Sequence, residues 1–157
     1  MDIETLNPIL KKLVTKNRGI QDAVLVSSEA ELITYPLAEW DEESITTMAA
    51  QMLYLTDKTR EHLGWSSLEQ MWLQAEDNYF IGIRCSNEVF LLVKAINAGP
   101  LGGLRMEINR TVKQLEKLLN SDVVLDPGEI TQDGYNGDFV NNESREGEEG
   151  TWRGRKL

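Results

Sequence analysis

The side chains best suited to catalysis or metal binding are scarce in this chain of 157 residues. It contains one histidine, His62, and one cysteine, Cys85. One residue of each type is too few for a Cys/His zinc site, a disulfide or a Cys–Cys redox pair. We expect His62 to lie near the end of a helix, where it meets the helix dipole, and Cys85 to be a buried structural thiol.

Two other groups of residues resemble known sites but lack essential members. The glycine-rich segment 99–103 has no Lys-Ser/Thr pair, which a nucleotide P-loop requires, so we expect a tight connection before a helix. A cluster of acidic residues fits helix capping better than an acid/base pair. Its members are Glu39, Asp41, Glu42 and Glu43. The sequence therefore predicts no catalytic residues, no metal site and no cofactor, and we do not expect an enzyme.

The charge balance narrows the choice of partners. The chain has 26 Asp and Glu against 16 Lys and Arg, which gives a formal net charge of −10. Nucleic acid and anionic membranes repel such a chain at long range, so neither is an expected partner. No apolar run reaches the roughly 18 residues of a membrane-spanning helix, and no secretory leader is recognised. We expect a cytoplasmic protein without direct membrane insertion.

The C-terminal part differs in composition from the rest. Residues 126–157 carry six of the 12 glycines and eight acidic residues, with only scattered apolar residues. Such a segment buries too little apolar surface to offset its ordering entropy. We therefore predict a folded domain over 1–125 and a disordered acidic tail over 126–157. The tail could serve solubility alone, or Trp152 and the basic residues after it could form a short docking motif.

Hydrophobic periodicity predicts an α+β domain. A helix capped by Asp2 runs to about residue 17, and two short strands, 23–26 and 32–35, form a hairpin. A second helix follows between its N-cap Asp41 and its stop Gly64. Three further strands and a last helix are expected at 68–75, 79–85, 89–96 and 104–120. The order α-β-β-α-β-β-β-α predicts a five-stranded antiparallel sheet with flanking helices.

Two of the helices have unusual surfaces. Residues 48–55 of the second helix are apolar on nearly all sides, although a helix on a sheet needs only one apolar stripe. Either the helix is sandwiched within the chain, or its second face meets a partner, which the small size of the domain favours. Opposite the apolar side of the last helix lie four cationic residues. They are Arg105, Arg110, Lys113 and Lys117.

The order of these elements and several motifs resemble the roadblock family, which includes dynein light chains. The segment Gly19-Ile20-Gln21-Asp22-Ala23-Val24-Leu25-Val26-Ser27 is similar to the family's first strand, and a final helix after Gly102-Gly103-Leu104-Arg105 also fits the family pattern. The turn Glu29-Ala30-Glu31 departs from the Asp-Gly pair that is usual there. The resemblance extends from about Ile3 to Leu119.

This resemblance implies a homodimer, or a heterodimer with another roadblock protein, formed through the second helix and an edge strand. Carried over by position, the interface residues are Met48, Ala49, Met52, Leu53, Leu55, Met71 and Leu73. It also implies a regulatory or scaffold module that binds a Ras-like small GTPase and modulates its nucleotide cycle, in some members as a GTPase activator, or its localisation. The alternative is a small-molecule sensor domain of similar α/β topology, whose sheet and helix enclose a ligand.

Overall fold

The computed structural model describes residues 2–123 of the chain. Backbone contacts divide the chain into a compact unit from Met1 to Asn120 and a second unit from Ser121 to Leu157. The predicted tail, 126–157, and its Trp152 lie outside the described residues. The predicted domain boundary at residue 125 therefore stays a prediction.

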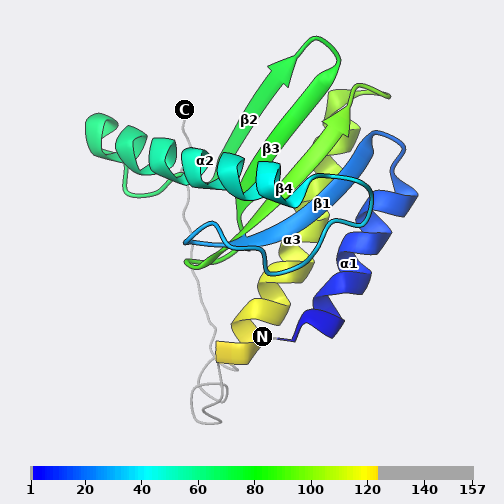
Figure 1. The fold of residues 1–157 in the computed structure, drawn as a ribbon, viewed down its shortest axis with the longest axis horizontal. Coiled ribbons are helices and arrows are strands. Elements are labelled where there is room, and N and C mark those ends of the chain that lie inside the picture. Colours follow the sequence, from blue (N-terminus) through cyan, green and yellow to red (C-terminus); the bar gives the residue numbers. More distant parts are fainter. Residues whose placement is uncertain (1, 124–157) are drawn as a thin grey trace, which may run out of the picture. The chain divides into compact units, whose positions relative to one another are not determined.

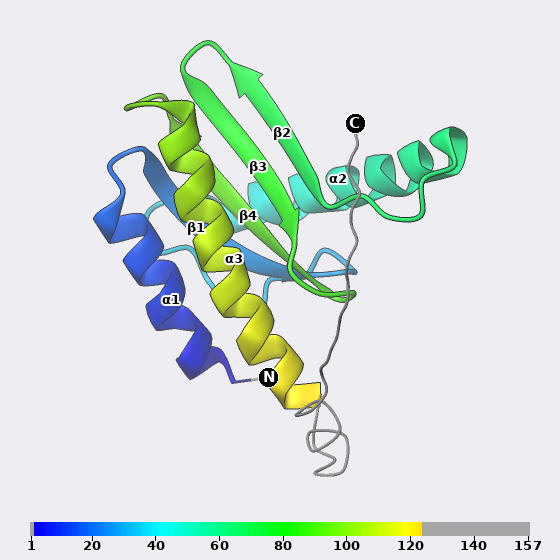
Figure 2. The same ribbon diagram turned by 180° about the vertical axis from the view of Figure 1, so that it is seen from behind.

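Within the described residues the chain forms three helices and four strands. They are α1 (Ile3–Lys16), β1 (Ile20–Ser27), α2 (Glu42–Leu63), β2 (Gln70–Ala75), β3 (Asn78–Arg84), β4 (Val89–Ile96) and α3 (Leu101–Val123). The strands form one antiparallel sheet in the order β1-β4-β3-β2. Helices α1 and α3 lie next to each other on one face of this sheet, and α2 crosses the other face (Figures 1 and 2). The α+β prediction is confirmed, but the sheet has four strands instead of the predicted five.

The strand predicted at residues 32–35 is wrong, because side chains take the place of part of the backbone pairing that a strand needs. Its backbone pairing with β1 is limited to one isolated bridge, between Val26 and Leu32, and to the N–H groups of Ile33 and Thr34, which both donate to the carbonyl of Leu25. The backbone N–H of Leu25 donates to the buried hydroxyl of Thr34 (2.9 Å) instead of to a carbonyl group. Pro36 has no N–H and cannot extend a ladder. The segment therefore runs beside β1 without becoming a strand.

A buried carboxylate ties the rest of this segment to β1. Asp22 is 1% exposed, and its side chain accepts hydrogen bonds from the backbone N–H groups of Ala23 (2.8 Å), Leu37 (2.9 Å) and Ala38 (2.9 Å). Ser27 adds a backbone bond from its N–H to the carbonyl of Glu31 (2.8 Å). Together with the Thr34 hydroxyl, these bonds occupy the outer edge of β1. The edge of the sheet at β1 is thus closed within the chain.

The predicted helix ends are confirmed at three positions. The Asp2 side chain accepts from the N–H of Glu4 (3.1 Å), and the Asp41 side chain accepts from the N–H of Ser44 (2.8 Å). Gly64 ends α2 in the left-handed conformation, at a φ of 72°. Helix α3 begins at Leu101, three residues before the predicted start.

Alternating side chains of the strands build two hydrophobic layers. Ala23 and Leu25 of β1 pack toward α1 and α3, whereas Val24 and Val26 pack toward α2. All four are fully buried. Because both faces of β1 are covered, its residues form the continuous apolar run that the sequence shows.

Candidate interaction surface of α2 and β2

One stripe of α2 packs on the sheet within the chain. Its buried residues recur at helical spacing and are Ile45, Ala49, Met52 and Thr56. Trp40, just before the helix, contacts Phe80 of β3 edge to face, with ring centroids 6.2 Å apart. The helix is therefore anchored to the sheet by a single face, as a surface helix requires.

The contact between α2 and the sheet leaves no room for a ligand. Gly82 of β3 lies directly under Met52, so closely that a Cβ at this position would overlap the methionine sulfur. The remaining hollow beside them, bordered by Met71 and Phe90, has a volume of about 10 Å³. That is about the space of one water molecule. The geometry of this layer does not favour the alternative prediction of a ligand enclosed between sheet and helix.

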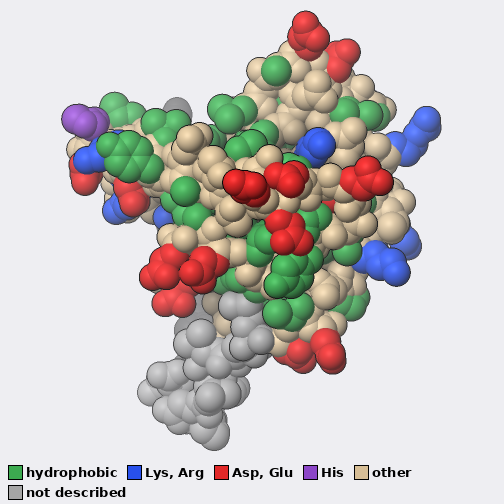
Figure 3. All heavy atoms as spheres, viewed as in Figure 1, with side chains coloured by type: hydrophobic (Ala, Val, Ile, Leu, Met, Phe, Trp, Pro, Cys, Tyr) green, Lys and Arg blue, Asp and Glu red, His purple; other side chains and the backbone are tan. Residues whose placement is uncertain are grey.

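The outer side of α2 and the segment after it expose large apolar side chains. Tyr54 is 66% exposed, Leu55 51%, Leu63 55% and Trp65 51%. In Figure 1 the C-terminal part of α2 extends past the sheet at β2, and Figure 3 shows hydrophobic side chains gathered along it. No described residue covers this side of the helix.

The edge strand β2 continues the exposed surface. It is the last strand in the sheet order, and within the described residues its backbone pairs only with β3. Leu73, in the middle of the strand, is 52% exposed. An open strand edge with an exposed leucine is a ready site for pairing with another strand. We refer to Tyr54, Leu55, Leu63, Trp65 and Leu73 together as the α2/β2 surface.

The seven residues predicted for the dimer interface divide into three groups. Ala49 and Met52 are buried against the sheet of their own chain and are not available to a partner. Met48, Leu53 and Met71 are half-buried at the rim of the same hydrophobic layer. The two that remain exposed are Leu55 and Leu73. The structure adds three exposed apolar side chains to these two: Tyr54, which lies within the apolar stretch 48–55, and Leu63 and Trp65 at the end of the helix.

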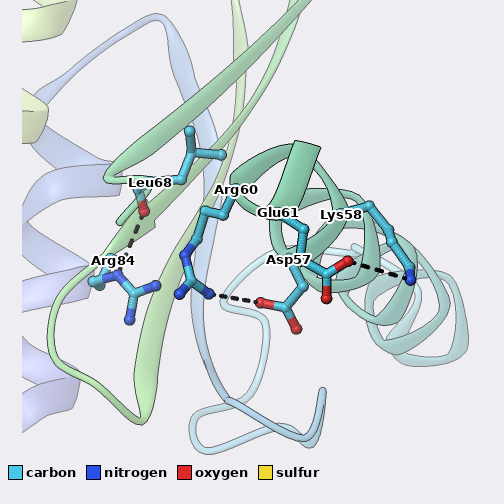
Figure 4. A network of polar contacts seen from close by, with 6 residues as sticks. All are labelled: Asp57, Lys58, Arg60, Glu61, Leu68 and Arg84. Atoms are coloured by element: carbon cyan, nitrogen blue, oxygen red, sulfur yellow. Dashed lines mark hydrogen bonds and ion pairs between the residues drawn. The ribbon is translucent and has the colours of Figure 1, made fainter. Parts of the chain in front are cut away.

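The C-terminal part of α2 also carries charged pairs, shown in Figure 4. Asp57 pairs with Arg60 at 3.3 Å and Lys58 with Glu61 at 3.6 Å, all on the exposed helix. Exposed pairs of this spacing contribute less than about 1 kcal/mol each.

Two arginines at this end of α2, Arg60 and Arg84, have polar groups that are only partly satisfied by hydrogen bonds or ion pairs. The Nε atom of Arg60 is buried without a hydrogen-bond partner. Arg84 donates from Nε to the carbonyl of Leu68 (3.4 Å) and lies over the Phe90 ring, 5.1 Å from its centroid. No carboxylate within the described residues pairs with Arg84. The guanidinium group of Arg84 is thus held by a carbonyl group and an aromatic ring, next to its cross-strand neighbour Glu69.

The cysteine and the histidine, the side chains best suited to catalysis or metal binding, form no candidate metal site within the described residues. Cys85 is buried, as predicted, and burial together with the nearby Glu116 carboxylate raises the pKa of its thiol from 9.0 to about 12. His62 is exposed in the last turn of α2, as predicted. Over residues 2–123 there is no cluster of His, Cys, Asp and Glu that could hold a metal ion. None of the helices in this range is long and apolar enough to cross a membrane.

Comparison with known proteins agrees with this fold. The family model of the Roadblock/LC7 domain matches residues 7–95. Among curated protein sequences, none matches the chain at a significant level.

Solved structures of similar fold include two bacterial MglB proteins. Myxococcus xanthus MglB aligns with a TM-score of 0.66 and 16% identity, over 77% of this chain and 99% of that chain. The gliding protein MglB from Thermus thermophilus aligns with a TM-score of 0.63 and 15% identity, over 75% and 90% of the two chains. A Roadblock/LC7 domain from Streptomyces avermitilis aligns with a TM-score of 0.60 and 19% identity, over 71% and 94%. At these identities the likeness concerns the fold.

Proposed function

Because the chain belongs to the Roadblock/LC7 domain family, we propose that it is a dimeric regulatory or scaffold module that binds a Ras-like small GTPase and modulates its nucleotide cycle or localisation. The observation that carries the dimer is the α2/β2 surface, where exposed apolar side chains adjoin an open strand edge. Large exposed apolar side chains on a helix beside an open strand edge are typical of a protein–protein interface.

The two edges of the sheet support a dimer through β2. The edge at β1 is closed by the Asp22 and Thr34 hydrogen bonds, whereas the edge at β2 has no cover among the described residues. Two β2 strands related by a two-fold axis would pair antiparallel and continue the sheet into a second copy. The same axis would bring the projecting part of each α2 against the other copy and bury Leu55. A related roadblock protein could replace the second copy.

The GTPase part of the proposal rests on the family resemblance. That resemblance implies proteins that work beside Ras-like GTPases and rarely perform chemistry themselves. Activation of a GTPase would then act by rearranging the catalytic residues of the GTPase itself.

The oligomeric state tests the dimer. We expect a particle of twice 17.8 kDa by light scattering. The variant Leu55→Glu/Leu73→Glu should be a folded monomer, because both side chains are half exposed in one chain but would carry an unpaired charge into a buried interface. A penalty of about 3 kcal/mol raises the dissociation constant about 100-fold. Leu101→Glu, on an exposed leucine of α3, is the matched control and should remain dimeric. A wild-type monomer, or a dimer that both glutamates leave unchanged, would refute the interface.

GTPase binding needs its own test. Ras-like GTPases encoded beside this protein are loaded with GDP or a GTP analogue and mixed with it, and binding and hydrolysis rate are measured. We expect a complex in at least one nucleotide state. The absence of a complex in both nucleotide states would refute the GTPase role. The dimer would still be tested separately by light scattering.

A further inference from the structure

The exposed side of α3 is cationic on a chain that is acidic as a whole. Its basic residues, which we call the α3 stripe, are Arg105, Arg110, Lys113 and Lys117. The exposed residues of α3 between Gly102 and Asn120 are basic, apolar, amide or glycine, and the two acidic residues of this range, Glu107 and Glu116, are half-buried. Residues 1–125 contain 18 acidic and 12 basic residues, so the positive charge of the α3 stripe is opposite in sign to the net charge of the domain. From Arg105 to Lys117 the stripe covers 13 residues, with a rise of about 18 Å along the helix.

Most of the charge in the α3 stripe is not neutralised within the described residues. Arg110 pairs with Glu107 at 3.1 Å, and Arg105 lies over the ring of Trp72 at 4.2 Å, a contact that holds the guanidinium group without cancelling its charge. The side chains of Lys113 and Lys117 take part in no hydrogen bond or ion pair of the described chain. Three of four cations thus have no carboxylate partner.

The surroundings of the α3 stripe add apolar surface and further lysines. Met106 lies among the cations and is 58% exposed. With Gly102, Arg105, Asn109, Arg110 and Lys113 it borders a shallow hollow on the helix. On the side of α1, a groove of about 280 Å³ brings Lys12 and Lys16 next to Arg110. The surface therefore offers cations on both sides of an apolar contact point.

We infer that the α3 stripe binds an acidic segment of a partner protein, with carboxylates that pair with the cations and an apolar side chain that packs on Met106. The exposed side chain of Met106 favours a peptide over a phosphate polymer, because the phosphate backbone has no apolar group that could pack on it. Nucleic acid and anionic membranes present a wide negative field that the net charge of −10 opposes, whereas a short acidic segment is felt mainly within the Debye length of about 8–10 Å.

The α3 stripe lies on the other side of the sheet from the α2 side chains of the α2/β2 surface. Helix α3 lies on the face of the sheet opposite α2, as Figures 1 and 2 show from the two sides. A partner on the stripe would therefore leave α2 free, and the inference goes beyond the proposed function.

The test uses the full chain and a labelled synthetic peptide of Glu-Glu-Leu repeats, with a Gln-Gln-Leu peptide as the neutral counterpart. Fluorescence anisotropy should show binding of the acidic peptide only, with an affinity that falls as salt rises. Lys113→Glu/Lys117→Glu should weaken binding at least about tenfold. Lys58→Glu/Lys94→Glu changes the net charge equally on exposed lysines of α2 and β4 and should have little effect.

Several outcomes would overturn the inference. These are equal binding of the neutral peptide, equal loss in both double variants, or no binding of the acidic peptide. Binding of phosphatidylserine vesicles or single-stranded DNA in place of the peptide, lost in Lys113→Glu/Lys117→Glu, would assign the stripe to a different class of partner. A wild-type monomer that still binds the peptide would refute the proposed dimer and support the stripe.

Discussion

The buried carboxylate of Asp22 should hold the loop between β1 and α2, and its removal is expected to destabilise the domain strongly. One oxygen, Oδ1, accepts from the N–H groups of Ala23 and Leu37, and Oδ2 accepts from that of Ala38. Leu37 and Ala38 are 15 and 16 residues away in the chain. A single side chain therefore closes a long loop onto the sheet.

The geometry gives different costs for two substitutions. Asp22→Ala leaves the buried N–H of Ala23 without an acceptor, at about 1–3 kcal/mol, and breaks two further charge-assisted bonds whose donors can partly turn to water. We expect about 3–4 kcal/mol in total, a large part of the roughly 5–15 kcal/mol that stabilises a domain. Asp22→Asn can keep both bonds to Oδ1 but places an amide N–H₂ against the Ala38 N–H. It should cost about 1–2 kcal/mol.

Urea denaturation followed by circular dichroism measures these free energies, at one protein concentration because dimerisation would add to stability. Asp77→Asn is the matched control, since this exposed side chain makes no hydrogen bond or ion pair within the described residues, and it should change stability by less than about 0.5 kcal/mol. Amide exchange adds a local readout. Asp22→Asn should expose the Ala38 amide and leave Leu37 protected, whereas Asp22→Ala should expose both. Wild-type stability of Asp22→Ala would refute this reasoning.

Two further predictions concern single residues. Ala30 has a φ of +66°, so Ala30→Gly should raise the free energy of unfolding by about 0.5–1 kcal/mol in urea denaturation, whereas Ala38→Gly, at a negative φ, should lower it. The folded-state pKa of Cys85 is raised to about 12 from 9.0, so its contribution to stability should be complete below about pH 9 and decline as the pH rises toward 12. Cys85→Ala should lack this decline, and the difference between the two unfolding curves over that range isolates the thiol; parallel curves would contradict the prediction.

Local signals predicted the position of α2 well, because the ends of a helix and the spacing of its apolar residues depend on residues close in sequence. Asp41 and Gly64 mark its limits, and both act as the sequence indicated. The excess of apolar residues in the helix corresponds to side chains that the described chain leaves exposed, among them Tyr54 and Leu55. Which of these residues face the sheet depends on how the helix packs on it. Ala49 and Met52, predicted for the interface, face the sheet of their own chain and are buried there. The absence of a Cβ at Gly82 lets the helix approach the sheet here, a contact between residues distant in the chain.

The missing fifth strand shows what alternation alone cannot predict. Residues 32–35 have the apolar and β-branched character of a strand, and Ile33 does donate its N–H to the carbonyl of Leu25 (2.8 Å). Beyond this bond, the Thr34 hydroxyl and the Asp22 carboxylate accept the backbone N–H groups of Leu25 and Leu37. Which side chains become acceptors depends on their burial in the folded domain. Ala30 likewise adopts the left-handed turn that the family usually builds with glycine. The turn was recognised from its position, but its strain appears only in the structure.

The two proposed surfaces have a geometric relation that sharpens both tests. If two β2 strands pair antiparallel, the two-fold axis stands perpendicular to the sheet, so helices on one face in each copy remain on one face of the dimer. Both α3 stripes would then lie on the face opposite both α2 helices. Arg105 stacks on Trp72 of β2 itself, so each stripe begins next to the dimer axis. A linked pair of acidic peptides should therefore bind the dimer more tightly than one peptide, by an effective-concentration effect that the monomeric Leu55→Glu/Leu73→Glu variant cannot show. Equal affinities of single and linked peptides for the wild-type dimer would mean that the stripes do not share a face, and the β2 pairing would have to be abandoned even if a dimer exists.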